Sequence, residues 1–207
     1  MTKKKLEKMM NWPSFSKMDI KSVSNVLKSN KTNYSFGKIG KSFEKKYSKY
    51  CGTKYALTIS NGTLALESAL SALDIKKGDE VIVTPRSFVA TASSILSIGA
   101  KPVFVDVEEE NGNIDPQEIK KNITKKSKAI ICVHLGGLPC KMNEIVSIAK
   151  QNKLDIVEDC SQAHGAKYNL KSVGSFGSIG TWSFCQDKNI STGGEGGMIT
   201  TNSPILY

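Results

Sequence analysis

The fold is decided by residues 55–84, which read YALTISNGTLALESALSALDIKKGDEVIVT. The two ends of this stretch, 55–59 and 80–84, are short apolar and β-branched runs, which predict buried strands. Residues 63–73 between them place apolar side chains along one stripe of a helix. These side chains are Leu66, Ala69, Leu70 and Leu73. A strand, a helix and a second strand in this order indicate parallel strands joined by a crossover helix.

The same alternation continues along the chain. Strand-like runs occupy seven segments: 55–59, 80–84, 102–107, 129–134, 154–158, 180–184 and 197–201. Further helices are predicted at 87–98, 115–122 and 142–151, and the first is apolar nearly all round, so we expect it to be buried. A glycine-rich loop joins the last two strands. These patterns predict an α/β fold of three layers, αβα, with a mostly parallel seven-stranded sheet.

The net charge of +10 is concentrated near the N-terminus. Residues 1–54 hold 14 lysines and three acidic residues, a balance of +11, and the rest of the chain carries −1. Such a segment is typical of an arm that binds nucleic acid or anionic lipid, or of a lysine-rich solvated surface. Of the 29 basic residues only Arg86 is an arginine, whereas base readout and phosphate clamps prefer arginine. We therefore expect no nucleic acid and no membrane as partner.

The cysteine and histidine content indicates a reducing compartment. Five cysteines occur, an odd number, and no two stand as C-x-x-C. We therefore expect a cytoplasmic protein without a disulfide framework or zinc ribbon. Only His134 and His164 are available, so no metal site rich in histidine is expected. The basic start of the chain has no apolar segment behind it, which argues against a signal peptide.

Two groups of residues at strand ends carry candidate chemistry, because ligands of such sheets bind at the carboxyl ends of the strands. Asn61-Gly62-Thr63 follows a strand and opens a helix, whose free N–H groups can bind a phosphate. A plain helix cap is the alternative. Glu158 and Asp159 end a buried strand, where acids are unfavourable unless paired or functional. One of them could hold a cationic ring nitrogen, and charge alone does not say which.

Lys188 follows the strand at 180–184 and precedes the glycine-rich loop. A lysine in a desolvated cleft can lose its proton and attack a carbonyl, and the alternative is a surface lysine among 28. The neighbouring signals favour the first interpretation. A phosphate cradle, an acid for a ring nitrogen and an amine that forms an imine are the three needs of pyridoxal phosphate. They occur in this order along one α/β chain.

With these residues identified, the sequence resembles the DegT/DnrJ/EryC1/StrS family of sugar aminotransferases, which are fold-type I pyridoxal-phosphate enzymes. Two motifs carry most of the resemblance: E-D-x-x-Q-A-H-G at 158–165 and S-F-x-x-x-K-x-x-x-x-G-G-E-G-G at 183–197. The resemblance covers nearly all of residues 37–201. Further matching stretches are SNGTLALESAL (60–70), GDEVIVTPRSFVATA (78–92), GAKPVFVDV (99–107), NIDPQEIKKNIT (113–124) and KAIICVHLGGLPCKM (128–142).

The resemblance implies roles for four residues around the ring of the cofactor, pyridoxal 5'-phosphate. Lys188 stands at the position of the lysine that forms the internal aldimine and then acts as general acid and base. Asp159 would keep the pyridine nitrogen protonated. Gln162 would lie near the phenolic oxygen, and Phe88 would stack on the ring.

The resemblance also implies a phosphate site formed by Gly62, Thr63 and Ser183. His164 matches the family motif and is expected to support the site from behind at most. No residue is expected to bind a metal.

The implied reaction moves an amino group from glutamate or glutamine to the keto group of a nucleotide-linked sugar. A homodimer and a role in polysaccharide biosynthesis are implied as well. The expected domains are a basic helical or extended segment, 1–36, and a pyridoxal-phosphate-binding large domain, 37–207. Members of the family are roughly twice this long, so we expect this domain to be incomplete and a small C-terminal domain to be absent. The alternatives are an inactive truncated fragment and a sugar dehydratase, although dehydratase relatives replace the lysine by histidine and Lys188 argues against that.

Overall fold

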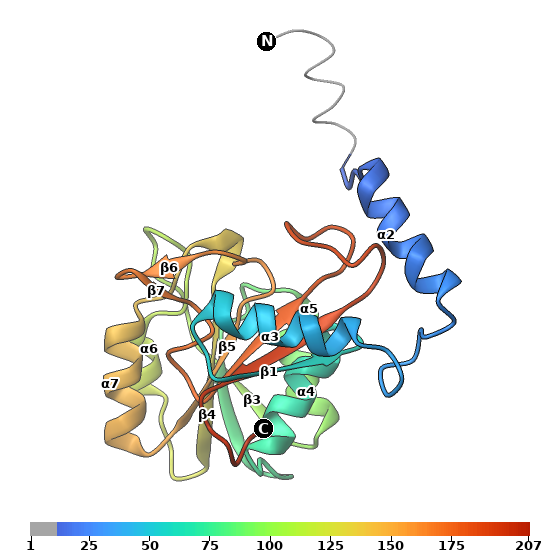
Figure 1. The fold of residues 1–207 in the computed structure, drawn as a ribbon. Helices are drawn as coiled ribbons and strands as arrows, with labels where there is room; N and C mark the ends of the chain where they lie inside the picture. Colours follow the sequence, from blue (N-terminus) through green and yellow to red (C-terminus); the bar gives the residue numbers. More distant parts are fainter. Residues whose placement is uncertain (1–11) are drawn as a thin grey trace, which may run out of the picture. The chain divides into compact units, whose positions relative to one another are not determined.

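The chain divides into two compact units, Met1–Phe43 and Glu44–Tyr207. The computed structural model describes residues 12–207 (Figure 1). The first eleven residues of the expected basic segment therefore lie outside the described residues. Within the described range, no helix is long and apolar enough to cross a membrane.

In the first unit, helix α2 (Lys17–Lys28) begins at a capping box. The Ser16 hydroxyl accepts the Asp19 N–H at 3.2 Å, and the Asp19 carboxylate accepts the Ser16 N–H at 2.7 Å. These two bonds satisfy backbone donors that a helix start otherwise leaves unpaired. No residue of α2 is buried, so the start of this helix is specified by its local sequence.

The second unit is built on a seven-stranded sheet with strand order β1-β9-β8-β5-β4-β2-β3. Its strands are β1 (Tyr55–Ile59), β2 (Glu80–Val83), β3 (Lys101–Phe104), β4 (Ser127–Val133), β5 (Asp155–Asp159), β8 (Ile179–Ser183) and β9 (Gly197–Thr201). The pairs from β8 to β3 are parallel, whereas β9 is antiparallel to β1 and β8. All seven predicted strands are present, which confirms the mostly parallel seven-stranded sheet.

Helices cover both faces of this sheet, which confirms the three-layer arrangement. α4 (Gly62–Ala72) and α5 (Val89–Ser97) pack on one face. α6 (Pro116–Lys121) and α7 (Met142–Asn152) pack on the other (Figure 1). As the sequence predicts, Asp115 is the N-cap of α6.

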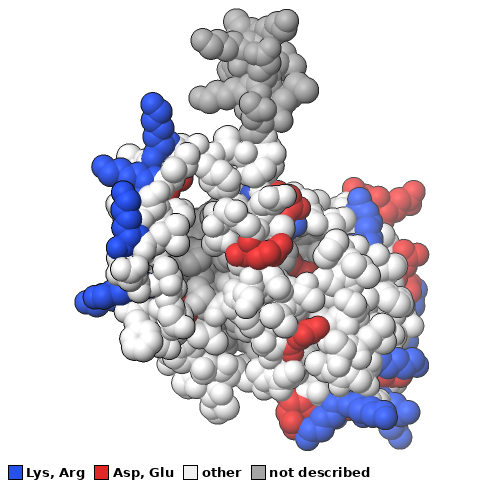
Figure 2. Space-filling model, turned by 90° about the vertical axis from the view of Figure 1, so that its right-hand side faces the viewer, with Lys and Arg blue, Asp and Glu red and all other residues white. Residues whose placement is uncertain are grey.

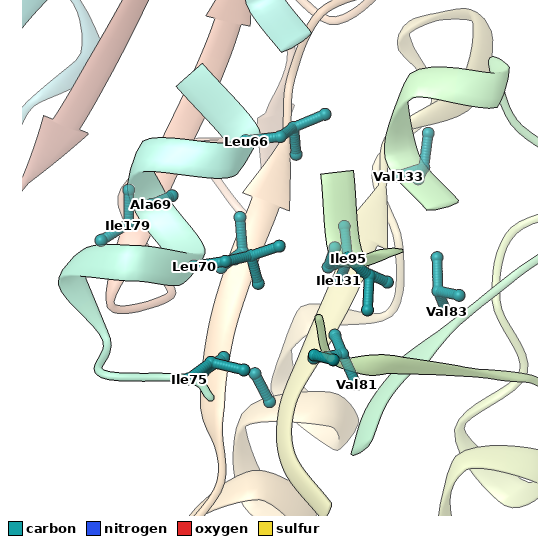
Figure 3. Packing of buried hydrophobic residues seen from close by; sticks show 13 residues of the cluster. Leu66, Ala69, Leu70, Ile75, Val81, Val83, Ile95, Ile131, Val133 and Ile179 are labelled. Carbon is teal, nitrogen blue, oxygen red and sulfur yellow. The ribbon is translucent and has the colours of Figure 1, made fainter. Parts of the chain in front are cut away.

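Successive residues of each inner strand enter opposite cores, because side chains alternate across a sheet. In β4, Ile131 belongs to the core under α4 and α5, and Ile130 belongs to the core under α6 and α7. Figure 3 shows the first of these cores, in which Leu70 of α4 points towards Ile95 and Ile131. This alternation determines which side chains at the strand ends can reach the candidate site.

The expectation that the helix at 87–98 is buried all round is wrong for its outer side. α5 buries Thr91 and Ile95, whereas Val89 and Leu96 are 69% and 60% exposed. A helix that lies on a sheet contacts it with one side only, and no element of the described residues covers the other.

A short hairpin is present that the sequence pattern does not predict. It pairs β6 (Lys167–Tyr168) with β7 (Lys171–Ser172). The two turn residues, Asn169 and Leu170, both have positive φ. A two-residue turn of this kind is usually signalled by Asn-Gly or Asp-Gly, and Leu170 gives no such signal.

Charged side chains are distributed unevenly over one face of the molecule. On the face shown in Figure 2, Lys and Arg stand mainly at the margins, and the middle carries mostly uncharged residues with a few Asp and Glu.

The Glu158 carboxylate is fully buried in the middle of the second unit. It accepts the backbone N–H groups of Gly174, Phe176 and Gly177 at 2.7–2.8 Å and faces Nε2 of His134 at 3.1 Å. Nδ1 of His134 accepts the Cys140 N–H, so Nε2 carries the proton and donates to Glu158. Four donors match the four lone-pair sites of a carboxylate, and they tie the ends of β4 and β5 to the loop before β8.

Replacing this carboxylate by an amide is expected to destabilise the second unit. In Glu158→Gln, an NH₂ group would face N–H donors, which leaves buried polar groups unpaired and lowers the free energy of unfolding by about 2–4 kcal/mol. The measurement is urea unfolding of the parent and the variant. Glu109→Gln, at an exposed glutamate, is the matched control and should stay within about 0.5 kcal/mol of the parent. Equal stabilities for the two variants would contradict this account of Glu158.

Candidate active site

A cavity of about 540 Å³ lies at the carboxyl ends of β1, β2, β5 and β8. All seven residues that the sequence singles out for cofactor binding or catalysis line it: Gly62, Thr63, Phe88, Asp159, Gln162, Ser183 and Lys188. They come from segments that are up to 126 residues apart in sequence, from Gly62 to Lys188. The fold therefore brings the predicted site residues together, and their individual roles stay predictions.

The turn between β1 and α4 contributes an anion-binding geometry. Asn61 is the N-cap of α4, and its side chain accepts the Leu64 N–H at 2.9 Å. The N–H groups of Gly62 and Thr63 belong to the first turn, where a helix has no acceptors of its own. At Gly62 the helix packs directly on β8, since a Cβ there would lie 2.8 Å from Cβ of Ser183. This close approach brings Gly62, Thr63 and Ser183 to the same cavity wall.

Asp159 ends β5 and is buried at the floor of the cavity. Its Oδ2 accepts the Thr91 hydroxyl at 2.9 Å, and its Oδ1 accepts the Ser161 N–H at 3.1 Å. A carboxylate with two donors keeps further lone pairs, so it can accept one more hydrogen bond from a group in the cavity.

The structure separates the two acids that charge alone leaves equivalent. Asp159 lines the cavity, whereas its neighbour Glu158 points into the opposite core. The reason is the alternation of side chains along β5. His134, which directly follows β4, shares the side of Glu158 and does not line the cavity.

Gln162 is held in place by the loop after β4. Its Oε1 accepts the Gly136 N–H at 2.8 Å. Gly136 has φ +61° inside the short 3₁₀ helix η1 (Leu135–Gly137), and this left-handed conformation favours glycine. The bond uses the acceptor of the Gln162 amide, so its NH₂ group is the part left to donate to a ligand.

Lys188 approaches the cavity from the loop after β8. Its backbone N–H donates to the Cys185 carbonyl at 3.0 Å, and its Nζ donates to Oδ2 of Asp187 at 3.0 Å. The Lys188 side chain is 20% exposed and that of Asp187 is 64% exposed. This hydrogen bond lowers the pKa of Asp187 below its ordinary value. Because Asp187 is largely in solvent, the pair is weak, and the lysine can leave it for a ligand.

Phe88 supplies an apolar wall. It stands at the N-cap of α5 without a capping hydrogen bond, and 68% of its surface is exposed. An exposed aromatic ring on a cavity wall is suited to stack on a flat ligand.

His164 lies behind the cavity wall and does not line it. Its Nε2 contacts the Ser183 carbonyl at 2.7 Å, and its Nδ1 contacts the Tyr47 hydroxyl at 2.7 Å. A carbonyl only accepts, so Nε2 carries the proton and Nδ1 accepts from Tyr47. Burial, with a contribution from the Lys188 charge, lowers the pKa of His164. A neutral imidazole therefore fixes the backbone of Ser183.

Three buried groups are close enough together to suggest a metal site. Ligand atoms of His134, Glu158 and Cys160 all lie within 4.8 Å of one another. Both ring nitrogens of His134 are already hydrogen-bonded, to Cys140 N and to Glu158. These bonds explain the cluster without an ion.

Two residues, Thr91 and Ser161, donate hydrogen bonds to Asp159, and the sequence pattern assigns a role to neither. Ser161 acts through its backbone N–H, which carries no side-chain signal. Thr91 is one of four hydroxyl-bearing residues in α5, and nothing in this pattern separates it from the three serines.

The contact between Gly62 and Ser183 predicts that the phosphate turn tolerates no side chain. Gly62→Ala would force its Cβ to 2.8 Å from Cβ of Ser183, which is expected to lower the free energy of unfolding by about 1–3 kcal/mol. Gly194→Ala is the matched control, because a Cβ there meets open space at ordinary φ. Urea unfolding of the two variants checks this, and a Gly62→Ala variant as stable as Gly194→Ala would refute the close contact.

A second prediction concerns the protonation of His164. Its pKa in the folded state lies below the unfolded value of about 6.5. The unfolded chain therefore takes up the proton first as the pH falls. The stability that the neutral ring provides is complete above about pH 6.5 and is lost as the pH falls from there through the folded-state pKa.

An NMR titration of the two histidines checks this prediction. The His164 midpoint is expected below 6.5. Tyr47→Phe removes the donor to Nδ1 and should raise that midpoint. A midpoint at or above 6.5 in the parent would contradict the assigned hydrogen bonds.

Comparison with known proteins gives the site a family context. Residues 13–207 match the DegT/DnrJ/EryC1/StrS aminotransferase family. The chain is similar to a GDP-perosamine synthase of Escherichia coli O157:H7, with 48% identity over 165 residues, which make up 80% of this chain and 45% of that protein. The chain spans about half the length of the curated relatives it matches.

Solved structures agree with the sequence match. An aminotransferase from Psychrobacter cryohalolentis is similar with a TM-score of 0.93 and 54% identity, over 94% of this chain and 49% of that chain. A GDP-4-keto-6-deoxymannose-3-dehydratase is similar with a TM-score of 0.86 and 32% identity, over 95% of this chain and 53% of that chain. Since the family match extends over nearly the whole sequence, the chain belongs to the DegT/DnrJ/EryC1/StrS aminotransferase family.

Proposed function

We propose that the protein is a pyridoxal-phosphate-dependent aminotransferase. It would move an amino group from glutamate or glutamine to the keto group of a nucleotide-linked sugar. The observation that carries the proposal is the presence of Lys188, buried Asp159 and the N-terminus of α4 around one cavity. These are an amine, an anion and a phosphate-binding helix end, the three groups that this cofactor requires.

The cavity residues fit the cofactor chemically. Asp159 has lone pairs left to accept an N–H from the ring nitrogen. Phe88 offers an exposed ring face. Because a Cβ at Gly62 would meet Ser183, the glycine lets the start of α4 lie directly beside Ser183, and both line the cavity. Residues 37–207 would form the cofactor-binding large domain.

Each residue would act on the bound cofactor in a distinct way. The cofactor itself supplies an electron sink for the carbon that loses a proton. Lys188 would hold the cofactor at its carbonyl carbon and would carry a proton between two carbons during the reaction, for which its amine must leave Asp187. Asp159 would keep the ring nitrogen protonated. Gln162 would donate a hydrogen bond from its NH₂ group to the phenolic oxygen.

The phosphate would rest on the N–H groups of Gly62 and Thr63 and on Ser183. His164 would hold the Ser183 carbonyl from behind, as its hydrogen bond supports.

The substrate class is supported by the names of similar proteins. GDP-perosamine synthases are among the similar proteins, and a dTDP-3-amino-3,6-dideoxy-alpha-D-galactopyranose transaminase of Aneurinibacillus thermoaerophilus also matches. We extend this class to the present protein as a proposal, together with a homodimeric state and a cytoplasmic location. A sugar dehydratase is the competing function, given the similarity to one, but Lys188 stands where the resemblance implies histidine in such enzymes.

Covalent trapping tests the proposal. The chain is incubated with pyridoxal phosphate and then with borohydride, which fixes an imine as a stable amine. Peptide mass spectrometry is expected to find the label on Lys188, and Lys188→Ala should abolish it. The reason is that Lys188 is the lysine that lines the cavity with Asp159.

Lys125→Ala, at an exposed lysine, is the matched control and should leave the label unchanged. Label spread over surface lysines, or label that persists in Lys188→Ala, would overturn the assignment of Lys188. Transamination by the protein with a nucleotide-linked keto sugar then separates the aminotransferase from the dehydratase.

A further inference from the structure

We propose that Thr91 is a positioning residue. It holds the Asp159 carboxylate in the orientation in which the carboxylate accepts a hydrogen bond from the ring nitrogen of the cofactor. This inference rests on the proposed function. It deepens that function by adding a residue of α5 that no sequence motif singles out.

The direction of the hydrogen bonds around Thr91 follows from their chemistry. Thr91 is 1% exposed, and its hydroxyl lies 2.9 Å from Oδ2 of Asp159 and 2.7 Å from the Ser87 hydroxyl. A carboxylate only accepts, so the single proton of Thr91 goes to Asp159 and Ser87 must donate to Thr91. The result is a directed chain from Ser87, on the cavity wall, through Thr91 to Asp159.

The chain has a defined effect on the carboxylate. A hydrogen-bonded chain polarises its members, so the Ser87 donor strengthens the bond from Thr91 to Asp159. Together with the Ser161 N–H on Oδ1, it gives each carboxylate oxygen one fixed donor. With both oxygens held, the carboxylate cannot rotate, and its remaining lone pairs have fixed directions.

Helix α5 makes Thr91 a rigid support. Its backbone N–H donates to the Phe88 carbonyl, and its own carbonyl accepts the Ser94 hydroxyl. Ser87 lies two residues before the start of α5, and its hydroxyl reaches that of Thr91 in the first turn of the helix. Phe88, the N-cap of α5, also lines the cavity. The start of α5 thus presents the side chain proposed to stack on the ring and the donor to Asp159 in a fixed relation.

The test compares the affinity of two compounds for the parent chain and for three variants. The compounds are pyridoxal phosphate and its analogue in which a CH group replaces the ring nitrogen. Thr91→Val keeps the shape of the side chain but removes the hydrogen-bond donor. It is expected to weaken the binding of pyridoxal phosphate about tenfold, the effect of one hydrogen bond to a charged group. The analogue should bind Thr91→Val and the parent equally, because it has no N–H for Asp159 to receive.

Two further variants separate positioning from folding. Thr91→Ser keeps the hydroxyl and should restore the affinity for pyridoxal phosphate. Ser93→Ala removes an exposed hydroxyl of the same helix and should change neither affinity. If Thr91→Val lost affinity for both compounds equally, Thr91 would have a merely structural role and the inference would be overturned. An undiminished affinity of this variant for pyridoxal phosphate would overturn it as well. If the parent binds neither compound, the proposed function fails and the inference fails with it.

Discussion

The buried carboxylate of Glu158 is the constraint on which the rest of the second unit depends. Without water, a carboxylate needs a donor at every lone pair, and here the donors come from His134 and from the loop that contains Gly174, Phe176 and Gly177. The loop must pass close to β5 to provide them. Only glycine fits at Gly174, since φ is +76° and a Cβ would meet the Trp182 ring. One acid therefore fixes the path of the chain between β5 and β8.

The same constraint determines the direction in which the side chain of the neighbouring residue, Asp159, points. Because Glu158 faces the core under α7, Asp159 must face the opposite side, where the cavity lies. Ser183 at the end of β8 is fixed by two contacts: Gly62 packs on its Cβ, and His164 binds its carbonyl. Asp159, Ser183 and the turn at Gly62 thus stand on strand ends and a helix start, which are rigid supports for binding geometry, whereas Lys188 and Gln162 stand on loops.

Much of this architecture could be predicted from the sequence, because its signals are periodic and local. Alternating strand and helix patterns gave all seven strands of the sheet, and Asp115 marked the start of α6. The hairpin at Asn169 and Leu170 could not be predicted, because its turn depends on positive φ at residues that do not favour it. Apolar composition alone also predicted wrongly that the outer side of α5 is buried, since burial depends on which neighbours cover a helix.

The candidate site divides in the same way. Residues with a chemical signature, such as Lys188 and the turn at Gly62, could be selected from the sequence, and the cavity collects them. Thr91 could not, because a threonine gains its importance here only from the carboxylate 68 positions away in the chain. Charge alone does not distinguish Glu158 from Asp159; the resemblance points to Asp159, and the opposite directions of the two side chains give a physical basis for the difference.

The antiparallel pairing of β1 with β9 has a consequence for biosynthesis on the ribosome. Among the described residues β1 is an edge strand whose ladder partner is β9, from Tyr55 opposite Thr201 to Ile59 opposite Gly197. The strand that leads into the α4 turn is thus made early, but its partner is made about 140 residues later. Such a long-range pairing closes slowly and late. The nascent chain must therefore expose an unpaired β1 until Gly197–Thr201 has left the exit tunnel, and in that interval it is open to chaperones and to strand pairing with other chains.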